Sequence, residues 1–481
     1  MKKHTSKTYQ KQIFVGSAIV LAATAAVYAQ QAPFSAAGTA QPPVPVRPPA
    51  AVKPATTNAA TTVTAPAPST ASTNEIIKAF EDTLGVSIPD AIAKGKVNVN
   101  VRARYEQVDQ SSATTPDQSF APTIRTRIGY TTAPLYGFQA MVEGENVSVI
   151  GPEHNYNAAG SNNQGKRPIV ADPPTTELNQ AWLSYNYTNL FKTKFGQQVI
   201  NLDNQRFIGS VDWRQNNQTF TGVTAGSEPI EKLNLYYGYL WDVQRVFGDV
   251  DGLPNANKDF NSSSHLINVS YSGWKYGRFV GYSYLLDLSN QAGNNNSCAT
   301  YGGYFAGQAP ITDKITADYR AEYAYQTDYA KSTLNYDASY YNFEGGFSIK
   351  PVAFGAGYEV LGSGENSGAG GGRTGFKTPL ATLHAFNGWD DVFLNTPANG
   401  LQDLYAYFQV NLPAQIPVRF IYHKFDADHG DGDYGQEYDV VVSRKFGKYW
   451  SGLLKYACYN GQDAPAAYTV NKFWAQVEFN F

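Results

Sequence analysis

From about residue 96 to its end, the chain alternates apolar and polar residues with a period of two. In VNVNVRARYE, which begins at Val97, valine, alanine and tyrosine occupy every second position, and asparagine, arginine and glutamate fill the positions between them. The final segment, Val470 to Phe481, alternates in the same way and ends the chain on an aromatic residue. This periodicity predicts extended strands with one apolar face and one polar face.

The pattern predicts about 18 such strands, an even number as single-chain bacterial barrels require. After the segments that start at Val97 and Thr123, the expected strands are 137–147, 178–188, 191–198, 217–226, 231–241, 263–272, 276–287, 298–307, 313–326, 338–349, 351–361, 401–411, 417–425, 435–445, 450–459 and 470–481.

The connections between these strands alternate between short and long. Short ones include TTAPLYG, YTNL and SGWKYG, whereas the long ones are polar and rich in Gly and Asn, as in 148–177, 199–216, 242–262 and 362–400. Short periplasmic turns and long outer loops produce this alternation in outer-membrane barrels, and a soluble sheet gives no reason for it. We therefore predict an all-β, antiparallel up-and-down transmembrane β-barrel in the lipid of the bacterial outer membrane.

The residues before the barrel predict export and a spacer. Residues 1–29 have a basic start, an apolar stretch and a small-residue end, as a secretory signal peptide does. Residues 30–73 are rich in Pro, Ala and Thr and are expected to form a disordered linker. Residues 74–94 are expected to hold a short periplasmic helix or plug, Glu75 to Leu84, ended by Gly85 and Pro89. The barrel takes residues 95–481.

The composition of the chain limits the functions that it can have. The full chain carries a formal charge of −3, and residues 1–29 contain four lysines and no acid, so the mature chain is more acidic. This balance argues against a nucleic-acid partner. The chain has only 2 Cys, for which packing is the expected role. We expect no cofactor and no metal. The acidic segment 426–434 is a poor match to a calcium loop, and the alternative is a solvated hairpin tip.

In a closed barrel the first and last strands pair, so their inward residues share one wall. The inward positions there are mostly basic, and we call this set the basic wall: Arg102, Arg104, Arg125, Arg127, Lys455 and Lys472. Arginine suits carboxylates because its fork of donors can bind them at two points. The alternative is that these cations pair with inward acids such as Glu106 and Glu478. The opposite wall is mixed in charge, with Asp318, Arg320 and Glu322 on one face of a strand.

The third long connection, INLDNQRFIGSVDWRQNNQTFTG, adds Arg206 and Arg214 among amide side chains. Here the sequence resembles the alginate-export family of outer-membrane barrels, through Gly196, Gln197, Gln198, Arg206, Gly209, Trp213, Arg214 and Gln215. A second stretch resembles the same family through Pro379, Leu380, His384, Phe386, Gly388, Trp389, Asp390, Thr396, Pro397, Gly400, Leu401 and Asp403.

The resemblance implies an 18-stranded pore with an arginine-lined constriction for acidic polysaccharide. It suggests Arg102, Arg104, Arg125, Arg127, Arg206 and Arg214 as residues that face the lumen. The acidic charge and the inward carboxylates depart from a strongly positive tunnel, so passage of small polar or anionic solutes stays open. For the segment around Trp389, the alternative to a binding site is a structured lid or loop anchor.

We therefore predict a channel for passive diffusion and not an enzyme. The sequence has no G-x-S-x-G and no H-E-x-x-H motif, and none of the five histidines after residue 29 has a recognisable nucleophile beside it. A structural tether or adhesin is the first alternative, and a barrel-embedded hydrolase is the second. The terminal strand ending in Phe481 predicts the barrel-assembly machinery as a partner.

Overall fold

A computed structural model describes residues 87–111, 117–159, 167–188, 190–248, 258–289 and 292–481. The strands of the barrel are β1 (Lys96–Gln110), β2 (Gln118–Thr131), β3 (Phe138–Val149), β4 (Thr175–Tyr187), β5 (Phe191–Gln198), β6 (Thr219–Ile230), β7 (Leu233–Gln244), β8 (Asp259–Trp274), β9 (Gly277–Leu286), β10 (Cys298–Pro310), β11 (Ile315–Asp328), β12 (Asp337–Ile349), β13 (Val352–Leu361), β16 (Leu401–Leu412), β17 (Ile416–Asp426), β18 (Asp433–Phe446), β19 (Trp450–Asn460) and β20 (Thr469–Asn480). Short pieces add β14 (Ser363–Glu365), β15 (Arg373–Gly375), η1 (Glu153–Asn155), η2 (Ala292–Asn294) and η3 (Leu383–Ala385).

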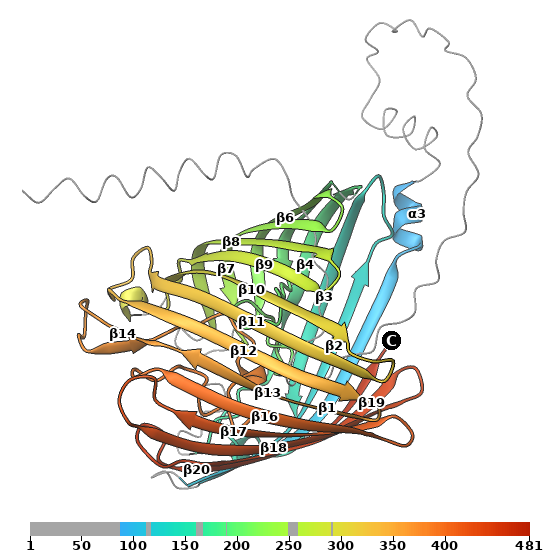
Figure 1. Cartoon of the computed structure of the whole chain (residues 1–481). Helices are drawn as coiled ribbons and strands as arrows, with labels where there is room; N and C mark the ends of the chain where they lie inside the picture. Colours follow the sequence, from blue (N-terminus) through green and yellow to red (C-terminus); the bar gives the residue numbers. More distant parts are fainter. Residues whose placement is uncertain (1–86, 112–116, 160–166, 189, 249–257, 290–291) are drawn as a thin grey trace, which may run out of the picture.

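The eighteen long strands form one closed antiparallel sheet (Figure 1). Each strand pairs with its neighbours in sequence, and β1 pairs with β20, so that Ala103 lies opposite both Ile124 and Val477. The two-stranded β14–β15 hairpin stands outside this sheet. This sheet confirms the predicted fold class, strand number and strand order. Because β1 pairs with β20, the sheet has no unpaired edge.

The two faces of the barrel differ as the alternation predicted. Outward side chains in the middle of strands are large, apolar and exposed, as for Ile128 at 59%, Phe343 at 54% and Leu454 at 55%. Their neighbours in sequence point inward and are buried and polar, as for Arg127 and Lys455. A soluble protein would not expose so many large apolar residues around its whole circumference. Hydrocarbon outside and polar groups inside account for this pattern.

One short helix, α3 (Ile88–Ala93), precedes the barrel in the described residues. Ser87 caps it by accepting a hydrogen bond from the Asp90 backbone N–H at 3.2 Å. Pro89 lies in its first turn, where a proline removes no helical hydrogen bond. The predicted helix Glu75 to Leu84 lies outside the described residues. None of the helices in the described part is long and apolar enough to cross a membrane.

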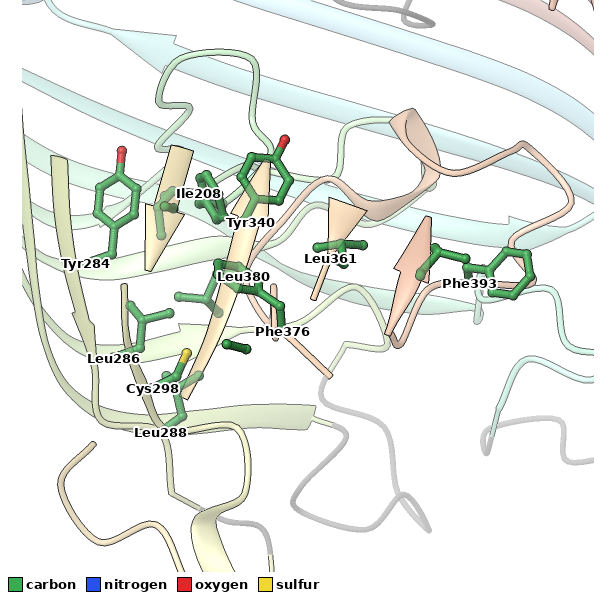
Figure 2. Close-up of a cluster of buried hydrophobic side chains, with 14 of the residues drawn as sticks. Ile208, Tyr284, Leu286, Leu288, Cys298, Tyr340, Leu361, Phe376, Leu380 and Phe393 are labelled. Carbon is green, nitrogen blue, oxygen red and sulfur yellow. The ribbon is translucent and has the colours of Figure 1, made fainter. Parts of the chain in front are cut away.

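Two long connections fold into the barrel. We call residues 199–218 the first infolded loop and residues 376–400 the second infolded loop. Together with the inner faces of the surrounding strands they build an apolar core inside the lumen. Figure 2 shows part of this core, in which Ile208 and Leu380 lie among Tyr284, Tyr340 and Phe376.

Candidate functional site

The two infolded loops are joined to each other. The backbone N–H of Gly209 donates to the Leu380 carbonyl at 2.9 Å, and that of Thr382 donates to the Gln205 carbonyl at 3.0 Å. Ile208 and Leu380 form an isolated parallel bridge between these bonds. Backbone hydrogen bonds in the lumen hold the two loops in one register, so they act as a single insert in the barrel.

At one end, Asp203 anchors the insert to β8, β9 and β10. Its carboxylate accepts hydrogen bonds from Asn268 Nδ2 at 2.8 Å and from the hydroxyls of Tyr304 and Tyr284 at 2.8 and 3.4 Å. Arg278 pairs with the same carboxylate at 3.4 Å. Four donors on one carboxylate compensate its burial and fix the loop at this wall.

At the other end, the first infolded loop lies on the basic wall. Arg102 Nη1 donates to the Asp212 carbonyl at 2.9 Å, and Arg125 Nη1 and Arg127 Nη2 donate to the Gln215 carbonyl at 3.3 and 3.2 Å. The first infolded loop therefore reaches from the β8–β10 side of the barrel to the β1–β2 side.

The same arginines are paired with carboxylates. Arg102 and Arg125 approach the Glu478 carboxylate at 3.3 and 3.4 Å, and Arg127 pairs with Glu145. These three guanidinium side chains and that of Arg104 are buried, since the four residues are between 1% and 7% exposed. Their positive charge is largely balanced within the wall.

Arg104 and Arg214 join a second group of acids. Arg104 approaches Asp172 at 3.7 Å, and its guanidinium lies 4.2 Å from the centre of the Trp213 ring. Arg214 Nη1 binds Glu106 at 3.1 Å, and its Nη2 binds Asp391 at 2.8 Å. One arginine thus connects the first infolded loop, the wall and the second infolded loop.

Arg206 makes the corresponding connection on the far side of the lumen. Its Nε and Nη2 bind the two carboxylate oxygens of Glu359 at 2.8 and 3.0 Å. Nη2 also donates to Asn387 Oδ1 at 2.9 Å, and the guanidinium lies 4.6 Å from the Phe386 ring. This bidentate pair ties both infolded loops to β13.

Lys455 sits in an aromatic box. Its ammonium lies 3.6 Å from the Trp389 ring, 4.2 Å from that of Trp213 and 5.3 Å from that of Trp474. It also donates to His384 Nε2 at 2.7 Å. Cation–π contacts of this kind stabilise a cation that has little access to water.

The other ring nitrogen of His384 contacts Asp391. Its Nδ1 lies 2.7 Å from Asp391 Oδ1, and Lys472 binds Asp391 Oδ2 at 2.7 Å. Burial lowers the pKa of His384 well below its usual value, and Lys455 lowers it further, which outweighs the opposite effect of Asp391. The ring is therefore neutral: it accepts at Nε2 and donates at Nδ1.

Asp212 is the carboxylate of this network that faces the open lumen, with 63% of its side chain exposed. Desolvation raises its pKa, but Arg127, Arg125 and Arg102 outweigh this and lower the pKa to about 2. Asp212 is therefore ionised throughout the physiological pH range. It places an exposed negative charge beside the basic wall.

The pKa of Asp390 is shifted in the opposite direction from that of Asp212. Its buried carboxylate lies beside that of Glu437. Burial and the Glu437 charge raise the pKa of Asp390 well above its usual value. Asp390 supplies its backbone N–H to Glu437 Oε1 at 2.8 Å, which holds the second infolded loop on β18.

The structure brings seven of the eight predicted site residues into one network and leaves Arg206 across the lumen. The network contains Arg102, Arg104, Arg125, Arg127, Arg214, Lys455 and Lys472. Pairing across strands, the alternative considered from the sequence, accounts for much of their contact. The segment around Trp389 contacts the wall through the Asp390 backbone N–H and the Trp389 ring, and both the binding role and the loop-anchor role stay predictions.

Sequence reasoning missed Asp172, Asp203, Asp212 and Asp391. All four lie in loops, where no alternation tells which way a side chain points. Asp391 directly follows Trp389-Asp390 in the segment that resembles the alginate-export family. Its position in that segment was the signal that could have marked it as a site residue.

Among the described residues, the acidic segment 426–434 forms no group of metal ligands and the two cysteines form no disulfide. Asp426 and Asp433, from the acidic segment and its edge, both pair with Lys424. Among the described residues, no three His, Cys, Asp or Glu side chains are grouped so that they could hold a metal ion. Cys298 and Cys458 are free thiols.

The closed barrel, with its apolar outer face and polar interior, is that of a protein of the bacterial outer membrane. A family model described as Alginate export matches residues 95–464, which is most of the chain and nearly the whole barrel. The chain therefore belongs to the Alginate export family. None of the curated proteins matches the sequence significantly.

Solved structures show the same architecture. OccAB3 of Acinetobacter baumannii aligns with a TM-score of 0.62 at 14% identity, over 81% of this chain and 100% of that one. OpdK of Pseudomonas aeruginosa, solved with vanillate, aligns with a TM-score of 0.62 at 10% identity, over 81% and 99%. OccAB4 of Acinetobacter baumannii gives 0.61 at 14% identity, over 82% and 99%. At such low identity the similarity concerns the fold alone.

Proposed function

We propose that small polar or anionic solutes diffuse passively through this barrel and that the basic wall favours the anionic ones. The observation that carries the proposal is the concentration of arginine on two neighbouring strands. Arg102 and Arg125 are direct cross-strand partners, and Arg104 and Arg127 lie on the same inner face. Like charges placed opposite each other destabilise a sheet, so a folding role alone gives no reason for this arrangement.

The arginines act mainly through their field, because they are buried. Their positive charge is felt in the lumen through the low-dielectric wall, and solute contacts fall on the accessible groups near them. Among the described residues, Arg102 Nε and Arg125 Nε also lack a hydrogen-bond acceptor. Buried donors without a partner favour an anion or water beside them.

Acidic oligosaccharide is the second substrate class. It is supported by the description of the family and by the carboxylate-binding geometry of arginine. The paired carboxylates Glu106, Glu145 and Glu478 weaken the positive field that a polyuronate would need. Liposome-swelling rates for neutral sugars, small carboxylates and oligouronates of matched size decide between the two classes.

Two further roles belong to the same proposal. We propose that the barrel-assembly machinery recognises Phe481, the exposed aromatic residue that follows β20. We assign no catalytic residue, since each histidine placed in the lumen, His384 and His423, is engaged with a carboxylate and lies in no triad with a nucleophile among the described residues.

We predict that Arg102→Ala combined with Arg125→Ala shifts the reversal potential towards cation selectivity. The double variant removes two positive charges and leaves Glu478 and Asp212 less compensated. A unit charge at 4 Å in water is worth about 1 kcal/mol, which corresponds to about a fivefold change in permeability ratio. Planar-bilayer recordings in a salt gradient measure the shift.

The matched control is Arg444→Ala, which removes an exposed arginine from the end of β18. It is expected to leave the reversal potential unchanged. Equal selectivity in the double variant and the unmodified protein would remove the basic wall from the proposal. A folded, reconstituted barrel without any conductance would contradict diffusion itself and favour a structural tether.

A further inference from the structure

The helix α3 carries apolar and charged side chains on opposite sides. Ile88 and Ile92 are four residues apart and share one side, where they are 47% and 57% exposed; we call this side the isoleucine face. Asp90 and Lys94 share the other side and form an ion pair at 3.3 Å. Two exposed isoleucines alone do not identify a partner, so the position of the helix decides what this face contacts.

Contacts with β2 and with the connection that follows it fix the position of α3. The Ala133 backbone N–H donates to the Ala91 carbonyl at 2.9 Å, and the Tyr130 hydroxyl donates to the Ile92 carbonyl. Ala91 is buried, so this side of the helix faces the protein. Gly95 permits the close approach, because a side chain at this position would collide with the Tyr130 ring.

Tyr130 also shows on which side of the sheet α3 lies. It follows Ile128 by two positions on β2, and Ile128 is an exposed, outward residue. The cross-strand partner of Tyr130 on β1 is Val97, which is exposed on the same outer face. Because a hydroxyl on this face reaches the helix, α3 lies beside the outer surface of the barrel, at the end of β1 (Figure 1).

Short turns and aromatic residues characterise the rim at which α3 lies. The connections between β2 and β3 and between β18 and β19 are short, as periplasmic turns are. Phe481 exchanges backbone hydrogen bonds of 2.9 and 3.1 Å with Val99, and Phe446 and Trp450 are exposed at the ends of β18 and β19 on the same rim. Barrels carry such aromatic girdles where hydrocarbon meets water. The helix, which leads into β1 at Lys96, is therefore next to this boundary.

We propose that the isoleucine face inserts into the periplasmic leaflet of the outer membrane and anchors the start of the barrel there. The lipid-facing surface at Val97 and Ile128 continues onto this face through Tyr130, so one layer of lipid covers both. The Asp90–Lys94 pair then points towards water. Helices with one apolar and one charged side bind at membrane interfaces in this way.

The anchor determines where the chain enters the barrel. With α3 held on the lipid side of the rim, the chain reaches β1 from beside the periplasmic mouth and not across it. The mouth of the lumen then stays open. The inference goes beyond the proposed function, because it does not depend on which solutes pass or on whether any solute passes.

Spin labelling of the mature chain tests the proposal. Nitroxides are attached at Ile88→Cys and, separately, at Ile92→Cys, in a chain that carries Cys298→Ser and Cys458→Ser so that the label has one target. The proteins are reconstituted in vesicles of phosphatidylethanolamine and phosphatidylglycerol. Collisions with oxygen, which concentrates in hydrocarbon, and with a water-soluble nickel chelate are measured by power saturation.

Two matched positions calibrate the measurement. Ile128→Cys is the lipid reference on the outer face of β2, and Lys94→Cys is the aqueous reference on the charged side of the same helix. We expect both labels on the isoleucine face to collide with the nickel chelate several times less often than the label at Lys94→Cys. Their oxygen collisions should be as frequent as those at Ile128→Cys.

Two outcomes would overturn the proposal. Nickel-chelate collisions on the isoleucine face as frequent as those at Lys94→Cys would place this face in water. Labels that neither reagent reaches would mean that protein, from this chain or a second copy, covers the face in place of lipid. Heat-modifiable mobility on gels verifies that each labelled variant forms a barrel, so that either outcome concerns the folded protein.

Discussion

Replacing Arg214 by methionine is expected to destabilise the barrel insert by about 3–5 kcal/mol, the usual cost of breaking a buried ion pair from one side. Arg214 binds Glu106 at 3.1 Å and Asp391 at 2.8 Å, and it approaches Asp172 at 3.9 Å. The substitution keeps much of the side-chain volume and leaves three buried carboxylates short of their cation. The first infolded loop should then detach from the wall.

Two measurements show this. The thermal midpoint of the detergent-solubilised barrel should fall, and single-channel recordings should show larger current fluctuations, because a detached insert moves within the conduction path. Arg444→Met is the control, since Arg444 is exposed at the end of β18. Unchanged stability and quiet recordings in Arg214→Met would mean that the carboxylates are compensated without this arginine, and that the insert is held by its apolar core.

The barrel was predictable from sequence because each strand carries its own evidence. In β1 the residues from Val97 to Glu106 alternate without interruption, and the inward set can be identified without knowing any partner strand. Pairing then follows from order, since short connections join antiparallel neighbours. Even the closing contact, β1 with β20, follows once the sheet is assumed to leave no edge.

The candidate site was predictable only in part, for a physical reason. Inward cations such as Arg102 could be read from the alternation, but their partners could not. Arg214 and Asp391 are 177 residues apart, and both lie in loops that have no periodicity. Their pairing depends on how two infolded loops join in the lumen, and that in turn depends on backbone bonds such as Gly209 to Leu380.

The helix α3 shows a different limit of prediction from sequence. Proline ends a helix that precedes it because it lacks a backbone donor, and the same property makes it suitable for the first turn of a helix that follows. In α3, Pro89 directly follows Ile88, the first helical residue, after the Ser87 cap. The local sequence fits both the end of one helix and the start of another, and the Ser87 cap marks the start of α3.

Filling the lumen with a fixed insert has a functional consequence. The first infolded loop is held at Asp203 on one side and at the basic wall on the other. We therefore expect a solute to meet groups whose positions are set by the barrel. Such preorganised groups discriminate between solutes without a conformational step.

Placing an arginine at the middle of the lipid-facing surface tests the premise on which every inward and outward assignment depends. Phe343 lies at the centre of β12 and is 54% exposed on the outer face. Phe343→Arg is expected to destabilise the barrel by about 2–4 kcal/mol, the cost of an arginine at the bilayer midplane. Urea-dependent unfolding in lipid vesicles, followed by tryptophan fluorescence, measures the loss.

Phe446→Arg is the matched control, because Phe446 is similarly exposed, at 52%, but ends its strand. Near the interface the same substitution costs about 0–1 kcal/mol. The difference between the two variants separates membrane depth from simple loss of an aromatic ring, which both share. If both variants were equally tolerated, hydrocarbon would not surround Phe343. The assignment of the opposite face to the lumen would then lose its basis, and Arg102, Arg127 and Asp391 would need a different explanation for their burial.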